Sequence, residues 1–122
     1  MKNYLKGETE NMEEEIKQFD IWVCDLGVDE RGLGWGIRPC IVVSNNTNNR
    51  HSDRVNVIPL TTSVKAPQVT HCIISSSERT STAICECIHT VYKAKMGQKS
   101  GHLNEMETLN VIYCMKKQFG IN

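Results

Sequence analysis

The chain has 122 residues, in which 14 Lys and Arg residues balance 14 Asp and Glu residues. This length fits one domain with a real hydrophobic core. The balanced charge argues against a protein that holds nucleic acid by bulk positive charge alone. The charge is unevenly spread, because residues 1–20 carry a net charge of −3 and the remainder carries +3.

Six cysteines in a short chain would favour a disulfide scaffold in a secreted protein. The N-terminal sequence MKNYLKGETENMEEEIKQ has no apolar signal segment, and no stretch is apolar enough to span a bilayer. We therefore expect a cytoplasmic protein without membrane contact. Its cysteines are expected to be reduced and to act mostly as small buried apolar groups.

The first elements in chain order are an acidic extension, a strand and a loop. In the extension, residues 1–18, Asn11 and the apolar residues after it predict a short, partly ordered helix. Alternation in FDIWVCDLG (19–27) predicts the first strand of the main domain, residues 19–122. The glycines and charges of residues 28–36 predict a loop suited to closing over a ligand.

Four further segments predict strands because they are short, apolar and bounded by polar residues. They are residues 37–45, 54–62, 69–75 and 83–92. Residues 46–53 between the first two are expected to form a polar turn. Pro39 and Pro59 lack an N–H for a sheet ladder, so each should lie at a strand end, on an edge or at a bulge.

The chain closes with a predicted helix. Asn104 and Glu107 form a capping box, and Gly120 follows as the terminator. Strands followed by one helix indicate a single, mainly β domain, a small barrel with a helix packed on it.

Arg38 is the most distinctive residue of the sequence, because it follows a glycine-rich loop and lies at the start of an apolar strand. An arginine that points inward needs an anionic partner, since an unpaired buried charge costs several kcal/mol. A snorkelling or salt-bridged structural arginine is the alternative interpretation.

Five segments occur in an informative order: IWVCDL, GLGWGIRP, VIPLTTS, VTHCII and CECIHTV. Over roughly residues 19–117 they resemble the MazF/PemK/Kid family of bacterial toxin endoribonucleases. The resemblance implies an SH3-like barrel of the CcdB/MazF/PemK type, usually homodimeric. It also implies sequence-specific, ribosome-independent cleavage of single-stranded messenger RNA, and inhibition by a cognate antitoxin protein.

By the same resemblance, the catalytic residues are Arg38 and Thr61, and Glu86 matches an acidic position near the active site. RNA carries its own nucleophile, the 2′-hydroxyl, so the enzyme need only align it, assist proton transfer and stabilise the growing phosphoryl charge. Arginine and threonine supply suitable donors. Neither a metal nor another cofactor is expected, and the products should be a 2′,3′-cyclic phosphate and a 5′-hydroxyl.

The candidate RNA-binding residues surround this pair, and they are Trp35, Gly36, Thr62, Ser63, Lys65, His71 and Ser81. Trp35 offers a face for a splayed base, although an indole pinned on a hydrophobic patch is equally compatible with the sequence. Leu33 stands where relatives often have an acid, so the resemblance leaves the identity of the general base open.

Three alternatives remain. Cys85, Cys87 and His89 share one face of a strand and are ligand types that zinc accepts, but a knuckle spacing is missing. The same fold also suits a non-enzymatic toxin that blocks a protein such as DNA gyrase. A barrel that binds RNA without cutting it is the third.

Overall fold

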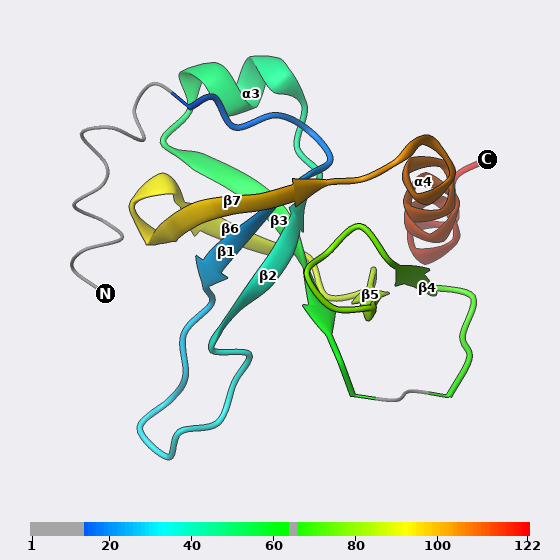
Figure 1. The fold of residues 1–122 in the computed structure, drawn as a ribbon, viewed down its shortest axis with the longest axis horizontal. Helices are drawn as coiled ribbons and strands as arrows, with labels where there is room; N and C mark the ends of the chain where they lie inside the picture. Colours follow the sequence, from blue (N-terminus) through cyan, green and yellow to red (C-terminus); the bar gives the residue numbers. More distant parts are fainter. Residues whose placement is uncertain (1–13, 64–65) are drawn as a thin grey trace.

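The computed structural model describes residues 14–63 and 66–122 and shows a mainly β protein with a C-terminal helix (Figure 1). Its elements are the strands Asp20–Asp25 (β1), Ile37–Val42 (β2), Arg54–Thr61 (β3), His71–Ile74 (β4), Ser81–Ile84 (β5), His89–Tyr92 (β6) and Met96–His102 (β7), the helices Asn46–His51 (α3) and Glu105–Phe119 (α4), and the 3₁₀ turn Lys93–Lys95 (η1). The predicted fold class, mainly β with a C-terminal helix, is confirmed.

The strands form an antiparallel sheet in the order β4-β5-β3-β2-β1-β7, with β6 paired to β3 beside this path. The central strand β3 changes partner along its length, since Val57 pairs with His89 of β6 and Leu60 pairs with Ala83 of β5. Pro59 lies at this change of partner, where its missing N–H interrupts neither ladder. A strand shared between two pairings in this way bends the sheet, as a small barrel requires.

Alternate residues of the central strands face two separate cores, because side chains of a strand point to opposite faces in turn. Ile21 and Ile41 belong to a core that also contains Val111 of α4. Trp22 and Val42, their neighbours in sequence, belong to a second core. The central sheet therefore has an apolar core on each face, and β1 and β3 are buried over most of their length, whereas β6 and most of β7 are not.

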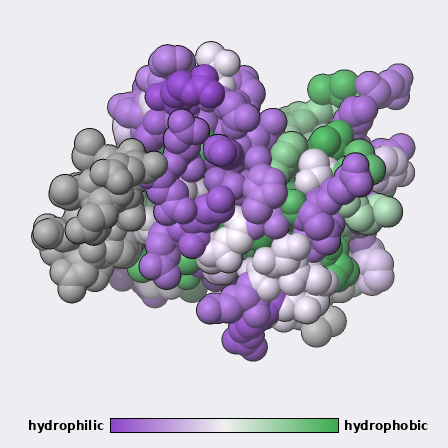
Figure 2. Space-filling view, turned by 45° about the horizontal axis from the view of Figure 1, so that its top comes forward, coloured by the Kyte–Doolittle hydropathy of each residue, from purple (hydrophilic) through white to green (hydrophobic). Residues whose placement is uncertain are grey.

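The C-terminal helix α4 begins and ends as predicted. Asn104 accepts a hydrogen bond from the Glu107 backbone while the Glu107 carboxylate accepts one from the Asn104 backbone, and Gly120 ends the helix with φ +66°. Apolar residues gather on the side of the molecule where α4 lies (Figure 2). There Phe19, Val43 and the helix line a groove of about 330 Å³.

Four expectations about local structure need correction. Residues 83–92 form two strands separated by a turn rather than one strand, and residues 46–51 of the expected polar turn form a short helix. Strand β7 was not predicted, because MGQKSGH has two glycines and no apolar alternation. Residues 14–19 are not helical, and Phe19 has φ +72°, which a helix cannot accommodate. The remainder of the predicted leader helix lies outside the described residues.

The last residues of the acidic extension contact the body of the protein. The Gln18 side chain donates to the Val43 carbonyl at 2.9 Å, and its backbone N–H donates to Asn46 Oδ1 at 2.8 Å. Ile16 packs against the second core.

Asp20 is a fully buried carboxylate that ties β1 to β7. It is held by His102 Nδ1 at 2.7 Å, by the Trp22 indole N–H at 3.2 Å, by the Lys17 backbone and by the Lys99 ammonium. Burial raises the pKa of Asp20, but these partners outweigh it and place the pKa below its ordinary value.

None of the helices in the described ranges is long and apolar enough to cross a membrane.

Candidate active site

The glycine-rich loop between β1 and β2 is a hairpin whose two arms are joined by backbone hydrogen bonds, and it projects from one end of the sheet (Figure 1). The Gly36 N–H donates to the Gly27 carbonyl at 3.0 Å, and a Cβ at Gly34 would lie 2.7 Å from the same oxygen. Asp29 accepts hydrogen bonds from two backbone N–H groups of the loop and pairs with Arg31. The Asp29 carboxylate is thus bonded within its own loop. It therefore does not supply the acidic group that relatives often have at the position of Leu33.

Arg38 emerges from this loop as the second residue of β2, and its main partner is Trp35. The Arg38 Nε donates to the Trp35 carbonyl at 2.6 Å, and the guanidinium lies over the indole at 5.0 Å from the ring centroid. Within residues 14–63 and 66–122 the terminal nitrogens of Arg38 have no hydrogen-bond or carboxylate partner. The guanidinium is therefore held in place with its forked donors open to an anion.

This arrangement changes the interpretation of both residues. The structural alternative for Arg38, a salt bridge, finds no carboxylate in the described residues. One face of the Trp35 indole is taken by Arg38, and the ring also makes an edge contact with His89 at 6.2 Å between centroids. Trp35 thus positions Arg38, and its stacking on an RNA base stays a prediction.

Thr61 ends β3 and is buried, with 7% of its surface exposed. Its Oγ1 accepts a hydrogen bond from the Ser63 N–H at 3.1 Å. Because that bond uses a lone pair, the hydroxyl proton of Thr61 remains to be donated. The turn after β3 therefore orients a hydroxyl donor.

Register places Arg38 and Thr61 at corresponding positions of neighbouring strands. Cys40 of β2 pairs with Pro59 of β3 at the last cross-strand pair, and Arg38 and Thr61 lie two residues beyond it on either strand. Here the strands diverge, since β2 continues along β1 and β3 along β5. The two donors thus flank the point where the sheet opens.

A second polar group joins the start of β4 to the turn after β5. The Glu86 carboxylate accepts from the Thr70 hydroxyl at 2.8 Å and contacts His71 Nε2 at 3.0 Å. Glu86 lies in a turn rather than within the single strand predicted for residues 83–92. A tight turn after β5, closed by the Cys87 N–H on the Ile84 carbonyl, turns Glu86 toward β4.

Protonation in this group follows from its contacts. Burial raises the pKa of Glu86, but hydrogen bonds from His71 and Thr70 outweigh it, so the pKa of Glu86 lies below its ordinary value. An ionised Glu86 requires a donor, which assigns the proton to His71 Nε2. Nδ1 of the same ring is buried without a hydrogen-bond partner in the described part of the chain. His71 therefore holds Glu86 in position from the protein side.

The remaining predicted RNA contacts differ in accessibility. Thr62 and Ser63 are exposed directly after Thr61. Gly36 uses its N–H and its carbonyl to close the loop. The buried Ser81 hydroxyl donates to the Arg79 carbonyl at 2.8 Å. The predicted contact through Lys65 lies outside the described residues.

Two contributors were missed at the sequence level. Thr70 immediately precedes His71 in a Thr-His pair, and this adjacency was the available signal. His89 was considered as a zinc ligand with Cys85 and Cys87, but its ring contacts Trp35 and its Nδ1 lies 3.2 Å from the Cys87 carbonyl oxygen. Cys85 instead faces the first core, so these three residues do not converge.

The segment from Glu86 to His89 spans four residues and carries contacts at both ends, one to His71 and one to Trp35. It therefore connects the carboxylate group to the arginine group along one rim of the sheet. The rim offers an arginine fork, a hydroxyl donor and an ionised carboxylate. Such a set can bind an anionic ester and assist proton transfer at its edge.

The protein combines a small antiparallel sheet, a capping helix and an open arginine at the start of the second strand. Comparison with known proteins identifies the family that has these features. The sequence model of the family described as "PemK-like, MazF-like toxin of type II toxin-antitoxin system" matches residues 17–119. The chain therefore belongs to this family of toxins.

Individual relatives agree with this assignment. The chain is 27% identical over 112 residues to a Staphylococcus epidermidis protein named Endoribonuclease MazF, covering 88% of this chain and 93% of the relative. A solved endoribonuclease in complex with its cognate antitoxin, from Mycobacterial species, is similar in fold with a TM-score of 0.75 and 23% identity, over 88% and 97% of the two chains. MazF from Deinococcus radiodurans has a TM-score of 0.74 at 11% identity, over 89% and 100%.

Proposed function

We propose that this protein is an endoribonuclease toxin that cleaves single-stranded messenger RNA by attack of a 2′-hydroxyl on the adjacent phosphate. The observation that carries the proposal is Arg38, whose terminal donors are open while Nε and the guanidinium face are held by Trp35. A guanidinium fork matches two phosphoryl oxygens and neutralises the charge that develops on them.

The remaining roles follow from the contacts of each residue. Thr61 donates a hydrogen bond from its hydroxyl to a phosphoryl oxygen, while its Oγ1 accepts one from the Ser63 N–H. Glu86, ionised and held by Thr70 and His71, receives the proton of the attacking 2′-hydroxyl. As the new P–O bond forms, the bond from phosphorus to the 5′-oxygen breaks, and the leaving oxygen takes a proton from water to become the 5′-hydroxyl. A lowered pKa makes Glu86 a weak base, so we assign most of the rate enhancement to charge stabilisation by Arg38. None of these steps requires a metal ion.

Flanking nucleotides are proposed to contact the exposed Thr62 and Ser63, and Lys65 beyond them. Trp35 is proposed to contact a base with the part of the indole that Arg38 leaves uncovered. These contacts would select a short RNA sequence and would make cleavage independent of the ribosome.

We propose two protein partners. A homodimer is supported by the apolar groove beside α4 and by exposed apolar residues on the helix, because such surfaces mark protein interfaces. A cognate antitoxin is proposed to occupy the rim near Arg38 with an acidic and apolar segment. Light scattering on the purified chain tests the dimer, and co-purification with a small acidic protein tests the antitoxin.

The central experiment incubates the purified protein with a long single-stranded RNA in EDTA. Fragments with 2′,3′-cyclic phosphate and 5′-hydroxyl ends are expected. Intact RNA retained on the protein would instead favour a non-cleaving RNA-binding barrel. Intact RNA without binding would favour a toxin that blocks a protein such as DNA gyrase.

A further inference from the structure

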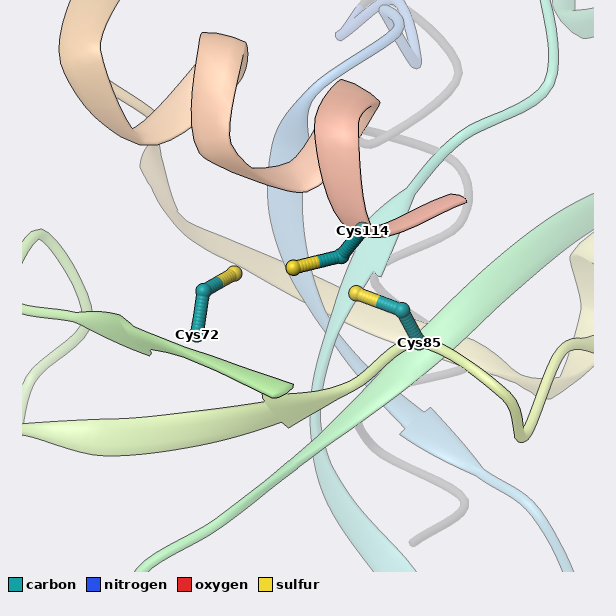
Figure 3. A group of neighbouring side chains, drawn as sticks. All are labelled: Cys72, Cys85 and Cys114. Carbon is teal, nitrogen blue, oxygen red and sulfur yellow. The ribbon is translucent and has the colours of Figure 1, made fainter. Parts of the chain in front are cut away.

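Three cysteines from separate elements meet beneath α4, and two of them, Cys72 and Cys85, are chain neighbours of His71 and Glu86. Cys72 comes from β4, Cys85 directly follows β5, and Cys114 comes from α4. Their sulfur atoms all lie within 4.8 Å of one another. The three side chains point toward a common centre between the helix and the strands (Figure 3).

Packing alone does not require this arrangement. The surrounding core is aliphatic, with Ile74 and Val111 among its members, and other small apolar side chains would fill the same volume. Thiols differ from such residues in that each loses a proton to become a soft metal ligand. Convergence of three sulfurs from β4, β5 and α4 thus creates a preformed ligand set.

We propose that Cys72, Cys85 and Cys114 bind one thiophilic d¹⁰ metal ion of the copper(I) class. Three soft sulfur ligands suit copper(I), whereas structural zinc sites almost always have four protein ligands. No fourth His, Cys or carboxylate atom joins the three within the described residues. On binding, each coordinating thiol releases its proton to solvent and donates a sulfur lone pair to the ion.

Geometry and accessibility are compatible with entry of an ion. Metal–sulfur bonds of about 2.3 Å place the sulfurs of a three-coordinate site about 4 Å apart, so the three side chains need to shift by less than about 1 Å. Cys85 and Cys114 are buried, whereas Cys72 is partly exposed. Cys72 therefore provides the path for the ion and keeps part of the negative charge of the site in contact with water.

Occupancy would join helix α4 to strands β4 and β5 through one ion. Without metal, the helix is held on the sheet by apolar contacts around Val111 and by the Glu107 carboxylate, which accepts from Ser75 and Ser76 of the segment after β4. The ion would therefore stabilise the folded state by binding to it and not to the unfolded chain.

The test is an anaerobic titration of the reduced full-length protein with copper(I) held by bicinchoninate, followed by X-ray absorption of the loaded protein. We expect one tightly bound equivalent, a sulfur-only shell of three ligands and a higher urea midpoint. Failure to take copper from the chelator, or a two-ligand shell, would overturn the site. Tighter binding of zinc in a parallel titration would overturn the copper assignment.

Variants locate the ion. Cys72→Ser, which changes the partly exposed ligand, is expected to lower copper affinity at least tenfold while leaving the circular dichroism spectrum unchanged. Cys87→Ser, outside the cluster, and Cys40→Ala, at a buried thiol of the other core that lies against Cys24, serve as controls and should keep the wild-type affinity. Loss of binding in either control with retention in Cys72→Ser would move the site elsewhere and refute the proposal.

Discussion

Replacement of Arg38 by lysine separates the charge of this side chain from its shape. Lysine keeps one positive charge but loses Nε, which donates to the Trp35 carbonyl at 2.6 Å, and the planar face that lies on the indole. Its ammonium would no longer be anchored and would present a single point of donation. Arg38→Lys is therefore expected to lose a preorganised donor, which typically costs about 10²–10³ in rate, or about 3–4 kcal/mol.

Arg38→Ala removes the charge as well, so its loss of rate should exceed that of the lysine variant. The effect on folding should be small, because the side chain is only partly buried and its cation–π contact contributes about 0.5–1 kcal/mol. Arg54 provides a matched control, since its guanidinium lies over Tyr92 at 5.4 Å at the start of β3. Arg54→Ala loses the same kind of contact and should keep full activity.

The assay follows cleavage of a fluorescent single-stranded RNA under single-turnover conditions, with urea unfolding measured on each variant. A folded Arg38→Ala protein that cleaves at the wild-type rate would refute the site assignment. An Arg38→Lys protein as active as the wild type would instead refute the argument from the guanidinium fork and leave charge alone as the requirement.

Three further outcomes are expected. Thr61→Val should reduce cleavage about 10²-fold by removing the hydroxyl donor, whereas Thr82→Val, at its partner position in β5, should not; equal rates for both variants would argue against donation by Thr61. Glu86→Gln should slow cleavage about 10²-fold, the low end for a general base because the lowered pKa makes Glu86 a weak one, and RNA affinity measured by anisotropy should change little; a loss confined to affinity would contradict this role. Asp20→Asn should lower the free energy of unfolding by about 1.5–3 kcal/mol at neutral pH, as hydrogen bonds to a buried charge are lost, while exposed Asp53→Asn should not. Folding lowers the pKa of Asp20, so this stabilisation is present above the pKa of the unfolded state and is lost as the pH falls through the pKa of the folded state. The urea midpoints of the wild type and of Asp20→Asn should therefore converge in acid. A constant difference between the two midpoints down to low pH would contradict this role of Asp20.

Short-range patterns predicted the elements that depend on neighbouring residues. The capping box at Asn104 and the terminator at Gly120 specify α4 locally, because each satisfies backbone groups within one turn of the helix. Alternation predicted the first strands to within a few residues, because the pattern of apolar residues reflects burial of strand faces. Strand β7 was not predicted, because its sequence has little apolar alternation. It is a strand because it pairs with β1, which is distant in sequence.

The positions of Arg38 and Thr61 were also readable from sequence, since a glycine-rich loop and a strand end are local features. Their surroundings were not. Arg38 is held by Trp35 rather than by a carboxylate, and Glu86 meets His71 across a turn that sequence alternation had treated as a continuous strand. Both contacts depend on side-chain conformations and on a break in the ladder, which sequence spacing does not report.

The cysteines show the same difference between what the sequence predicts and what the tertiary structure decides. Their number and types were evident in the sequence, and Cys85, Cys87 and His89 shared a spacing that suggested one face. The fold instead joins Cys85 with Cys72 and Cys114, because β4 pairs with β5 and α4 packs across both. The sequence by itself determined which side chains were available and how each element would begin and end. Only the tertiary structure decided which of them converge, since residues distant in sequence meet through strand register and helix packing.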